Sequence, residues 1–139
     1  MNNDNCVFCR IANGEIPAHF VYNDDDVMAI LDINPVAKGH MLVIPKYHAK
    51  YYHELPEKYA KKIATTLLLV TKALEAENYN ILQNNGKLAG QEVPHVHFHV
   101  IPKPSKDEGL GIRFPSKQET SEALTELAKE IKEKIDKLL

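Results

Sequence analysis

The stretch PHVHFHVIP, residues 94–102, places three histidines at alternate positions along an otherwise apolar run. Successive side chains of a β-strand point to opposite faces of a sheet, so this alternation predicts a strand. The three imidazoles would share one face, and the apolar residues between them would enter the core from the other. The first set is His95, His97 and His99, and the second is Val96, Phe98 and Val100.

Three uses of such a row of histidines are open at this point: metal binding, a solvated strand face, or catalysis. Neighbouring histidines on a straight strand would be ~6.6 Å apart and the outer pair ~13 Å apart, which strains a site for one ion made of all three. A solvated face more often carries Thr, Lys or Glu than three imidazoles. Other motifs in the chain have to decide among the three uses.

The composition is that of an ordinary globular protein, and it argues against several classes of function. The 139 residues suit one domain, with 44% hydrophobic and 26% charged residues. A net charge of −2 gives no general affinity for nucleic acid, and no apolar run approaches the ~20 residues that span a bilayer. The first ten residues lack the features of a signal peptide, so we expect a cytoplasmic protein in which Cys6 and Cys9 are thiols or metal ligands.

Local patterns predict an α+β order of elements in a single domain, residues 1–139. Its core is expected at about 6–103, and a C-terminal helix at about 117–138 opens with a capping box at Ser116–Glu119. Apolar residues spaced for one face predict a long helix from Pro56 to about Asn78. A short helix is expected from Val7, ended by Asn13-Gly14, and the expected strands are 19–24, 27–32, 40–46, 79–85 and 95–103.

Residues 95–101, HVHFHVI, resemble the signature of the histidine triad superfamily, in which three histidines alternate with apolar residues and two apolar residues follow. ILDINPVAKGHMLVIPKYH at 30–48 is similar to the first half-site of that superfamily. NNG at 84–86 resembles its intervening turn, and AGQEVPHVHFH at 89–99 has its spacing of Gly and Gln before the histidines. The resemblance covers about residues 6–103, roughly three quarters of the chain.

The resemblance implies both a fold and an assembly. The implied fold is an antiparallel five-stranded sheet with one long helix, a short N-terminal helix and a C-terminal helix. Members usually pair as homodimers, and the expected pairing surface is the long helix after Pro56 together with the strand at 79–85. Both segments have enough apolar residues for that role.

The resemblance also implies hydrolysis or transfer at the α-phosphate of a purine nucleotide. His97, the middle histidine, is the implied nucleophile, because a neutral imidazole attacks an anionic phosphate without the repulsion that a carboxylate would meet. Attack would give a nucleotidyl-histidine intermediate, which divides one difficult step into two. His99 and His40 are implied to hydrogen-bond the phosphate oxygens or the leaving group.

A nucleotide pocket follows from the same resemblance. Asp32 would accept hydrogen bonds from the ribose hydroxyls, and Asn84 and Gln91 would donate to the phosphate. Taken alone, Asn84 would be a turn residue beside Asn85-Gly86, and apolar residues near the pocket would belong to the core. The implied walls of the base pocket are Phe8, Ile11, Ile30 and Ile33.

The second motif is the cysteine pair in Cys6-Val7-Phe8-Cys9. Redox use would need a βαβ context, which the surrounding sequence does not supply. Some members of the superfamily carry this CxxC with a histidine after the LVIPK strand and the first histidine of the triad, and His48 and His95 match those places. The resemblance therefore implies a structural Cys2His2 zinc site, a standard closed ligand set, and the alternative is two inert thiols.

The sequence departs from the phosphoramidase branch of the superfamily in two places. Glu92 stands where that branch often has Ser, and Ile101–Pro104 stands where it often has Gly-Gly-Arg. We expect a nucleoside phosphoramidate as substrate, and hydrolysis of dinucleoside polyphosphates is the nearest alternative. A zinc-stabilised nucleotide-binding or scaffold module with little turnover is the alternative from another class.

Overall fold

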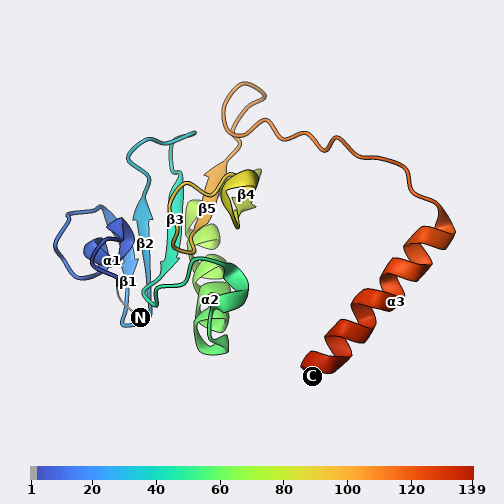
Figure 1. Cartoon of the computed structure of the whole chain (residues 1–139). Helices are drawn as coiled ribbons and strands as arrows, with labels where there is room; N and C mark the ends of the chain where they lie inside the picture. Colours follow the sequence, from blue (N-terminus) through green and yellow to red (C-terminus); the bar gives the residue numbers. More distant parts are fainter. Residues whose placement is uncertain (1–2) are drawn as a thin grey trace.

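Five antiparallel strands form one sheet in the order β1-β2-β3-β5-β4 (Figure 1). The computed structural model describes residues 3–139. The strands are β1 (Phe20–Asn23), β2 (Val27–Leu31), β3 (Met41–Pro45), β4 (Tyr79–Leu82) and β5 (Phe98–Pro102). The helices are α1 (Val7–Ala12), α2 (Glu57–Leu74) and α3 (Ser121–Leu138), with short 3-10 helices at Tyr52–Glu54 and Lys87–Ala89. The predicted α+β class and the five-stranded antiparallel sheet are confirmed.

The pairing of β3 with both neighbours brings three distant segments of the chain together. Leu31 at the end of β2 pairs with Met41 at the start of β3, and Leu42 pairs with His99 in β5. The connection between β2 and β3 is closed by the backbone N–H of Asp32, which donates to the carbonyl of His40 at 2.9 Å. Asp32, His40 and His99 therefore meet at one end of the sheet, although they span 68 positions of sequence.

Both faces of the central strands are covered, so the sheet has two hydrophobic cores. One face of β2 and β3 packs on α1, and the other packs on α2, which lies along the sheet (Figure 1). This double coverage explains why both strands read as continuous apolar runs in the sequence. The core on the α1 side contains Cys6, Phe8, Cys9, Ile11, Met28, Ile30, Leu42 and Ile44, and that on the α2 side contains Val27, Ala29, Met41, Val43, Ile63, Val70 and Val100.

The long helix α2 uses the apolar face that its spacing predicts. Ile63 and Val70 are buried against the sheet, and Leu67 and Leu74 are partly buried beside them. Burying a side chain of this size contributes about 1.5–3 kcal/mol each. The helix ends at Leu74, earlier than predicted, because Glu75 adopts the left-handed conformation with φ of 55°.

The histidine row does not lie on one regular strand, which corrects the sequence-based expectation. Strand β5 begins at Phe98, so of the three histidines only His99 belongs to it. His95 and His97 lie in the irregular segment before the strand, where the backbone N–H of Val96 donates to the carbonyl of Ala49 at 2.8 Å. The irregular backbone lets the first two imidazoles turn in different directions.

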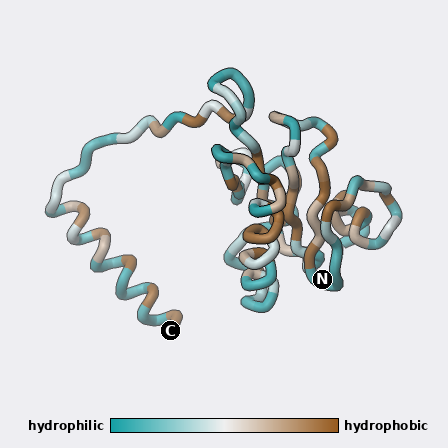
Figure 2. Tube along the Cα trace, turned by 180° about the vertical axis from the view of Figure 1, so that it is seen from behind, coloured by the Kyte–Doolittle hydropathy of each residue, from teal (hydrophilic) through white to brown (hydrophobic). Residues whose placement is uncertain are grey.

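The C-terminal helix begins later than predicted and stands apart from the sheet (Figures 1 and 2). Its N-cap is Thr120, whose Oγ accepts from the backbone N–H of Ala123 at 3.1 Å, so the predicted capping box at Ser116–Glu119 is wrong. Every residue from Gly111 to Leu139 is exposed. Within residues 3–139, no helix combines the length and the apolar character needed to cross a membrane.

Candidate active site and metal-binding cluster

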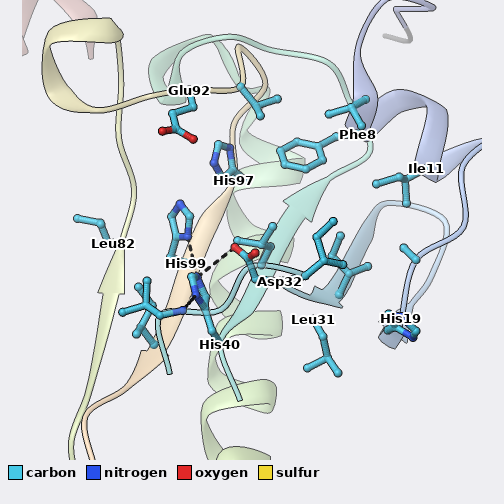
Figure 3. Close-up of a pocket in the computed structure, with 18 of the residues that line it drawn as sticks. Phe8, Ile11, His19, Leu31, Asp32, His40, Leu82, Glu92, His97 and His99 are labelled. Carbon is cyan, nitrogen blue, oxygen red and sulfur yellow. Dashed lines mark hydrogen bonds and ion pairs between the residues drawn. The ribbon is translucent and has the colours of Figure 1, made fainter. Parts of the chain in front are cut away.

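A cavity of about 600 Å³ opens between α1 and the end of the sheet where the histidines meet (Figure 3). Its walls come from α1, from the segment after it, from β2 and from the connection between β2 and β3. Nine of the residues that the sequence predicted line it together. They are Phe8, Ile11, Ile30, Asp32, Ile33, His40, Asn84, His97 and His99.

The hydrogen bond on one side of His97 determines which of its nitrogens faces the cavity. His97 Nδ1 lies 2.7 Å from the backbone carbonyl of His95, and a carbonyl only accepts, so Nδ1 carries the proton and donates. In the neutral ring, Nε2 then keeps a free lone pair. Burial lowers the pKa of His97 below its ordinary value, partly opposed by the His95 carbonyl and by the charges of Asp32 and Glu92. At neutral pH the ring is therefore an uncharged base with Nε2 available to a ligand.

A chain of hydrogen bonds sets the tautomers of the other two imidazoles. The backbone N–H of Val36 donates to His40 Nδ1 at 3.1 Å, so the ring proton of neutral His40 is on Nε2. That Nε2–H donates to His99 Nδ1 at 2.9 Å (Figure 3). His99 consequently carries its own proton on Nε2, which is its remaining group for a ligand in the cavity.

Burial keeps this pair of histidines neutral. It lowers the pKa of His40, although the Asp32 carboxylate opposes the shift. Burial also lowers the pKa of His99 to about 4, helped by the neighbouring charges that His97 and His40 would carry if protonated. Near pH 7 His97 therefore presents an imidazole lone pair to the cavity, and His99 presents an imidazole N–H.

Asp32, His40 and His99 bring possible ligand atoms within 4.8 Å of one another, as a metal site would. Asp32 Oδ2 lies 3.5 Å from His40 Nε2, and its other oxygen accepts from the backbone N–H of Asn34 at 2.8 Å. A metal ion would need a lone pair on His40 Nε2, which instead holds the ring proton. His40 and His99 therefore form a hydrogen-bonded pair, with the Asp32 carboxylate beside it.

The predicted polar residues Asn84 and Gln91 have different surroundings. Asn84 lines the cavity, and its amide donates to the carbonyl of Gly90 at 3.3 Å. Gln91 is buried beside the cavity, with its Nε2 donating to the carbonyl of Lys50 at 2.7 Å and its Oε1 accepting from the N–H of Gly86 at 2.8 Å. The side chain of Gln91 thus joins two loops and holds the turn that carries Asn84.

A second cluster contains Cys6, Cys9, His48 and His95, the four residues predicted as metal ligands. Their sulfur and nitrogen atoms all lie within 4.8 Å of one another. Cys6 Sγ is 3.2 Å from His95 Nδ1, Cys9 Sγ is 3.4 Å from His48 Nδ1, and the two Nδ1 atoms are 3.1 Å apart. Four donors converging at such distances are close enough to hold one metal ion.

The protonation of the cluster also suits a cation. His95 Nε2–H donates to the carbonyl of Pro45 at 2.7 Å, so its Nδ1 lone pair is directed at the cysteines. Burial lowers the pKa of His95 to about 4, which keeps that lone pair free. Burial also raises the pKa of the Cys9 thiol to about 11, so a bound cation would be needed to hold it as a thiolate.

Phe8 joins the two clusters. It lies in α1 between the two cysteines, and its ring meets His97 edge-on with centroids 5.0 Å apart. The same ring is 5.7 Å from that of His95. Metal binding at the N-terminus of α1 would therefore also hold one wall of the cavity against His97.

Sequence reasoning missed part of the site. His19 and Leu82 line the cavity (Figure 3), and isolated residues of these types carry no signal in one sequence. The groups that set the imidazole tautomers are the N–H of Val36 and the carbonyls of Pro45 and His95. Backbone groups are present at nearly every residue, so side-chain patterns could not have revealed them.

Residues 13–106 match the HIT domain family, which is more than half of the chain. The chain belongs to the HIT family. It is 48% identical to the adenosine 5′-monophosphoramidase hnt1 of Schizosaccharomyces pombe over 94% of this chain and 98% of that protein. Among solved HIT-fold structures, a hypothetical protein from Leishmania major is 45% identical with a TM-score of 0.90, covering 96% of this chain and 97% of its own. The histidine triad nucleotide-binding protein from Candida albicans is 39% identical with a TM-score of 0.90, covering 96% of this chain and 99% of its own.

Proposed function

We propose that this HIT protein is a hydrolase that cleaves the P–N bond of purine nucleoside 5′-phosphoramidates. The observation that carries the proposal is the hydrogen bond from His97 Nδ1 to the His95 carbonyl, which leaves a neutral Nε2 lone pair facing the cavity. Relatives named adenosine 5′-monophosphoramidase, 48%, 40% and 39% identical, support the same reaction class.

In the first step, His97 Nε2 attacks the α-phosphorus while the P–N bond to the leaving amine breaks. The electrons of that bond go to the amine nitrogen, which needs one proton. That proton would come from water in the open cavity, because neutral His99 keeps its Nε2–H. His99 Nε2–H would donate a hydrogen bond to the leaving nitrogen as negative charge develops on it, and His40 orients this donor through the 2.9 Å hydrogen bond to His99 Nδ1. The product of the step is a nucleotidyl group on His97 and a free amine.

In the second step, water attacks the phosphorus and the P–N bond to His97 breaks. One proton of that water passes to solvent, which restores the proton taken up by the amine, and His97 recovers its neutral form. The net reaction consumes one water and yields a nucleoside monophosphate and an amine. Phosphate charge would be met by His99 Nε2–H and by the amide of Asn84, both of which line the cavity.

The nucleoside would occupy the apolar part of the same cavity. Asp32 would accept from the ribose hydroxyls, and Ile30 and Ile33 lie on either side of it in the sequence. Phe8 and Ile11 of α1 would cover the base from the other side. Gln91 would act indirectly by holding the Asn84 turn, because its own amide is used by Lys50 and Gly86.

We further propose that the second cluster binds Zn²⁺ as a structural ion. Two cysteines and two imidazoles would form a closed tetrahedral set around the ion, with no ligand position left for catalysis. The ion would supply no chemistry to the reaction and would tie α1 to the segments carrying His48 and His95. Thiolate ligands need a reducing compartment, which supports a cytoplasmic location.

We also propose that two copies of the chain form a homodimer through α2 and β4. Strand β4 is at the edge of the sheet, where its backbone can pair with a second copy. Apolar side chains on both elements are exposed around that edge. They are Leu68 and Leu69 on α2, and Tyr79 and Ile81 on β4.

A substrate panel tests the proposed reaction. Adenosine and guanosine phosphoramidates should be hydrolysed, and acid quenching during turnover should trap one nucleotidyl group on His97, detected by peptide mass spectrometry. Faster hydrolysis of diadenosine polyphosphates would move the substrate to the alternative branch. Tight nucleotide binding without turnover of any substrate would contradict the enzyme and favour a binding module.

A further inference from the structure

The C-terminal arm, residues 111–139, ends in a helix whose apolar face is uncovered. Most of the stability of a helix in a protein comes from packing of its apolar face, and the 18-residue α3 has no such packing within the chain. A contiguous apolar stripe of this kind marks a contact surface. Its residues and their exposed fractions are Leu124 at 54%, Leu127 at 50%, Ile131 at 48%, Ile135 at 50% and Leu138 at 85%.

The charges of α3 favour a protein surface over a membrane. The helix carries five acidic and four basic side chains, so it lacks the positive charge that draws amphipathic helices to anionic lipid. Leu124, Ile131 and Leu138 are seven residues apart, with Ala128 and Ile135 on the same face between them. A stripe with this spacing suits packing along a helix of a protein partner.

The connection to α3 extends the uncovered surface. Ile112 is 46% exposed and Phe114 is 86% exposed, and they are two residues apart in an extended segment. Side chains at this spacing point to the same side of an extended chain. The arm therefore offers apolar groups along most of its length to whatever covers it.

The C-terminal arm lies in a similar place in two solved relatives. Residues 1–103 are only about three quarters of the chain, so superposing them alone could not give a TM-score of 0.90. The Leishmania major and Candida albicans structures reach that value over 96% of this chain, whereas the Sulfolobus tokodaii structure reaches 0.68 over the same share. Every residue of the arm is exposed here, so contacts within the chain do not account for the place that the first two structures share with it.

The side on which the arm lies identifies that surface. In both overall views α3 stands beyond α2 and β4, with open space between (Figures 1 and 2). This is the side of the free β4 edge and of exposed Leu68, Leu69 and Ile81. We infer that the two copies of a dimer exchange arms, each α3 docking its apolar stripe on the other copy. The inference rests on the α2 and β4 pairing proposed above.

Two matched double variants of the full chain test the exchange. Leu127→Gln with Ile131→Gln makes the stripe polar, and Lys129→Gln with Glu133→Gln changes the opposite face of the same helix with no change in net charge. Burial of two such side chains predicts a dimer dissociation constant raised at least about tenfold by the first pair and unchanged by the second. A wild-type dimer that both pairs leave unchanged would overturn the arm exchange while sparing the pairing through α2 and β4.

Photo-crosslinking distinguishes exchange between chains from packing within one chain. Benzoylphenylalanine replaces Leu124, and ¹⁵N-labelled and unlabelled protein are mixed, allowed to exchange and irradiated. Crosslinked peptide pairs of mixed isotope are expected. Crosslinks confined to single chains would overturn the inference. Light scattering that gives 15.7 kDa, the mass of one chain, for the unmodified protein would overturn both the pairing and the exchange.

Discussion

His95 and His97 are two residues apart, yet they belong to two different clusters. His95 donates from Nε2 to the Pro45 carbonyl and turns its Nδ1 lone pair to Cys6 and Cys9. His97 donates from Nδ1 to the His95 carbonyl and leaves its Nε2 lone pair for the cavity. One backbone carbonyl in each case decides which nitrogen is free, and so directs one imidazole lone pair to the cysteines and the other to the cavity.

The two clusters also differ in how they depend on the rest of the chain. The Cys6, Cys9, His48 and His95 set is closed on itself, with every donor directed inward. The His40, His97 and His99 set is open to the cavity on one side and ordered by backbone groups on the other. Damage to the first should therefore appear mainly in stability, and damage to the second mainly in turnover.

Replacing His97 should have the largest effect. His97→Ala removes the proposed nucleophile, so kcat/KM for an adenosine phosphoramidate is expected to fall by at least about 10⁴-fold, as when other enzymes lose their nucleophile. Metal content, measured by atomic emission, should stay as in the unchanged protein. His53→Ala, at an exposed histidine outside the cavity, is the matched control. A variant that keeps its rate without His97 would refute covalent catalysis.

Removing the cysteines should break the other cluster. Cys6→Ser with Cys9→Ser is expected to abolish bound zinc and to lower the melting temperature by about 10 °C or more, because metal-binding free energy is coupled to folding. Turnover measured at low temperature should remain within about tenfold, with KM rising as Phe8 loosens. An unchanged melting temperature, or zinc retained by the variant, would show that these cysteines are not ligands.

His40 is expected to act through His99, with a smaller effect. His40→Gln removes the imidazole N–H that orients His99, which should lower kcat about 10–100-fold, less than the loss of a catalytic hydrogen-bond donor because the His99 N–H itself remains. The loss should be greatest for a basic alkylamine leaving group, whose nitrogen carries the most negative charge as the bond breaks, and least for a weakly basic arylamine. An equal loss for both leaving groups would assign His40 to general structure instead.

The smallest effect should appear in the pH dependence of stability. The pKa of His99 is lowered from 6.5 to about 4 in the folded protein, so below pH 6.5 the unfolded chain binds a proton that the native state does not. Stability from this group is present above pH 6.5 and is lost as pH falls toward about 4. The free energy of unfolding, measured by urea denaturation at several pH values between 4 and 6.5, should fall with decreasing pH in the unchanged protein. In His99→Asn the slope of that free energy against pH should be smaller by up to about 1.4 kcal/mol per pH unit. Parallel curves for the two proteins would contradict a neutral, buried His99.

Much of this fold could be predicted from short-range patterns. The spacing of Ile63, Leu67, Val70 and Leu74 has the period of a helix. The continuous apolar run at 41–45 is typical of a strand that is buried on both faces. Asn13-Gly14 ends α1 as expected. These features follow from the chain's own geometry, so they need no knowledge of distant contacts. The residues that line the cavity could be named because their types and spacing match a known motif.

The sequence by itself determined most of the elements, the sheet class and the residues that line the cavity, because these depend on residue type and local period. Only the tertiary structure decided the roles of the backbone: the N–H of Val36 and the carbonyls of Pro45 and His95 set which imidazole nitrogens are free. The tertiary structure also places the Gln91 amide on the Lys50 carbonyl, where the sequence predicted a phosphate contact. It places α3 apart from the sheet, where the sequence predicted a helix of the same domain. These outcomes depend on which groups are brought within hydrogen-bonding distance across the fold, and no local pattern of side chains encodes that distance.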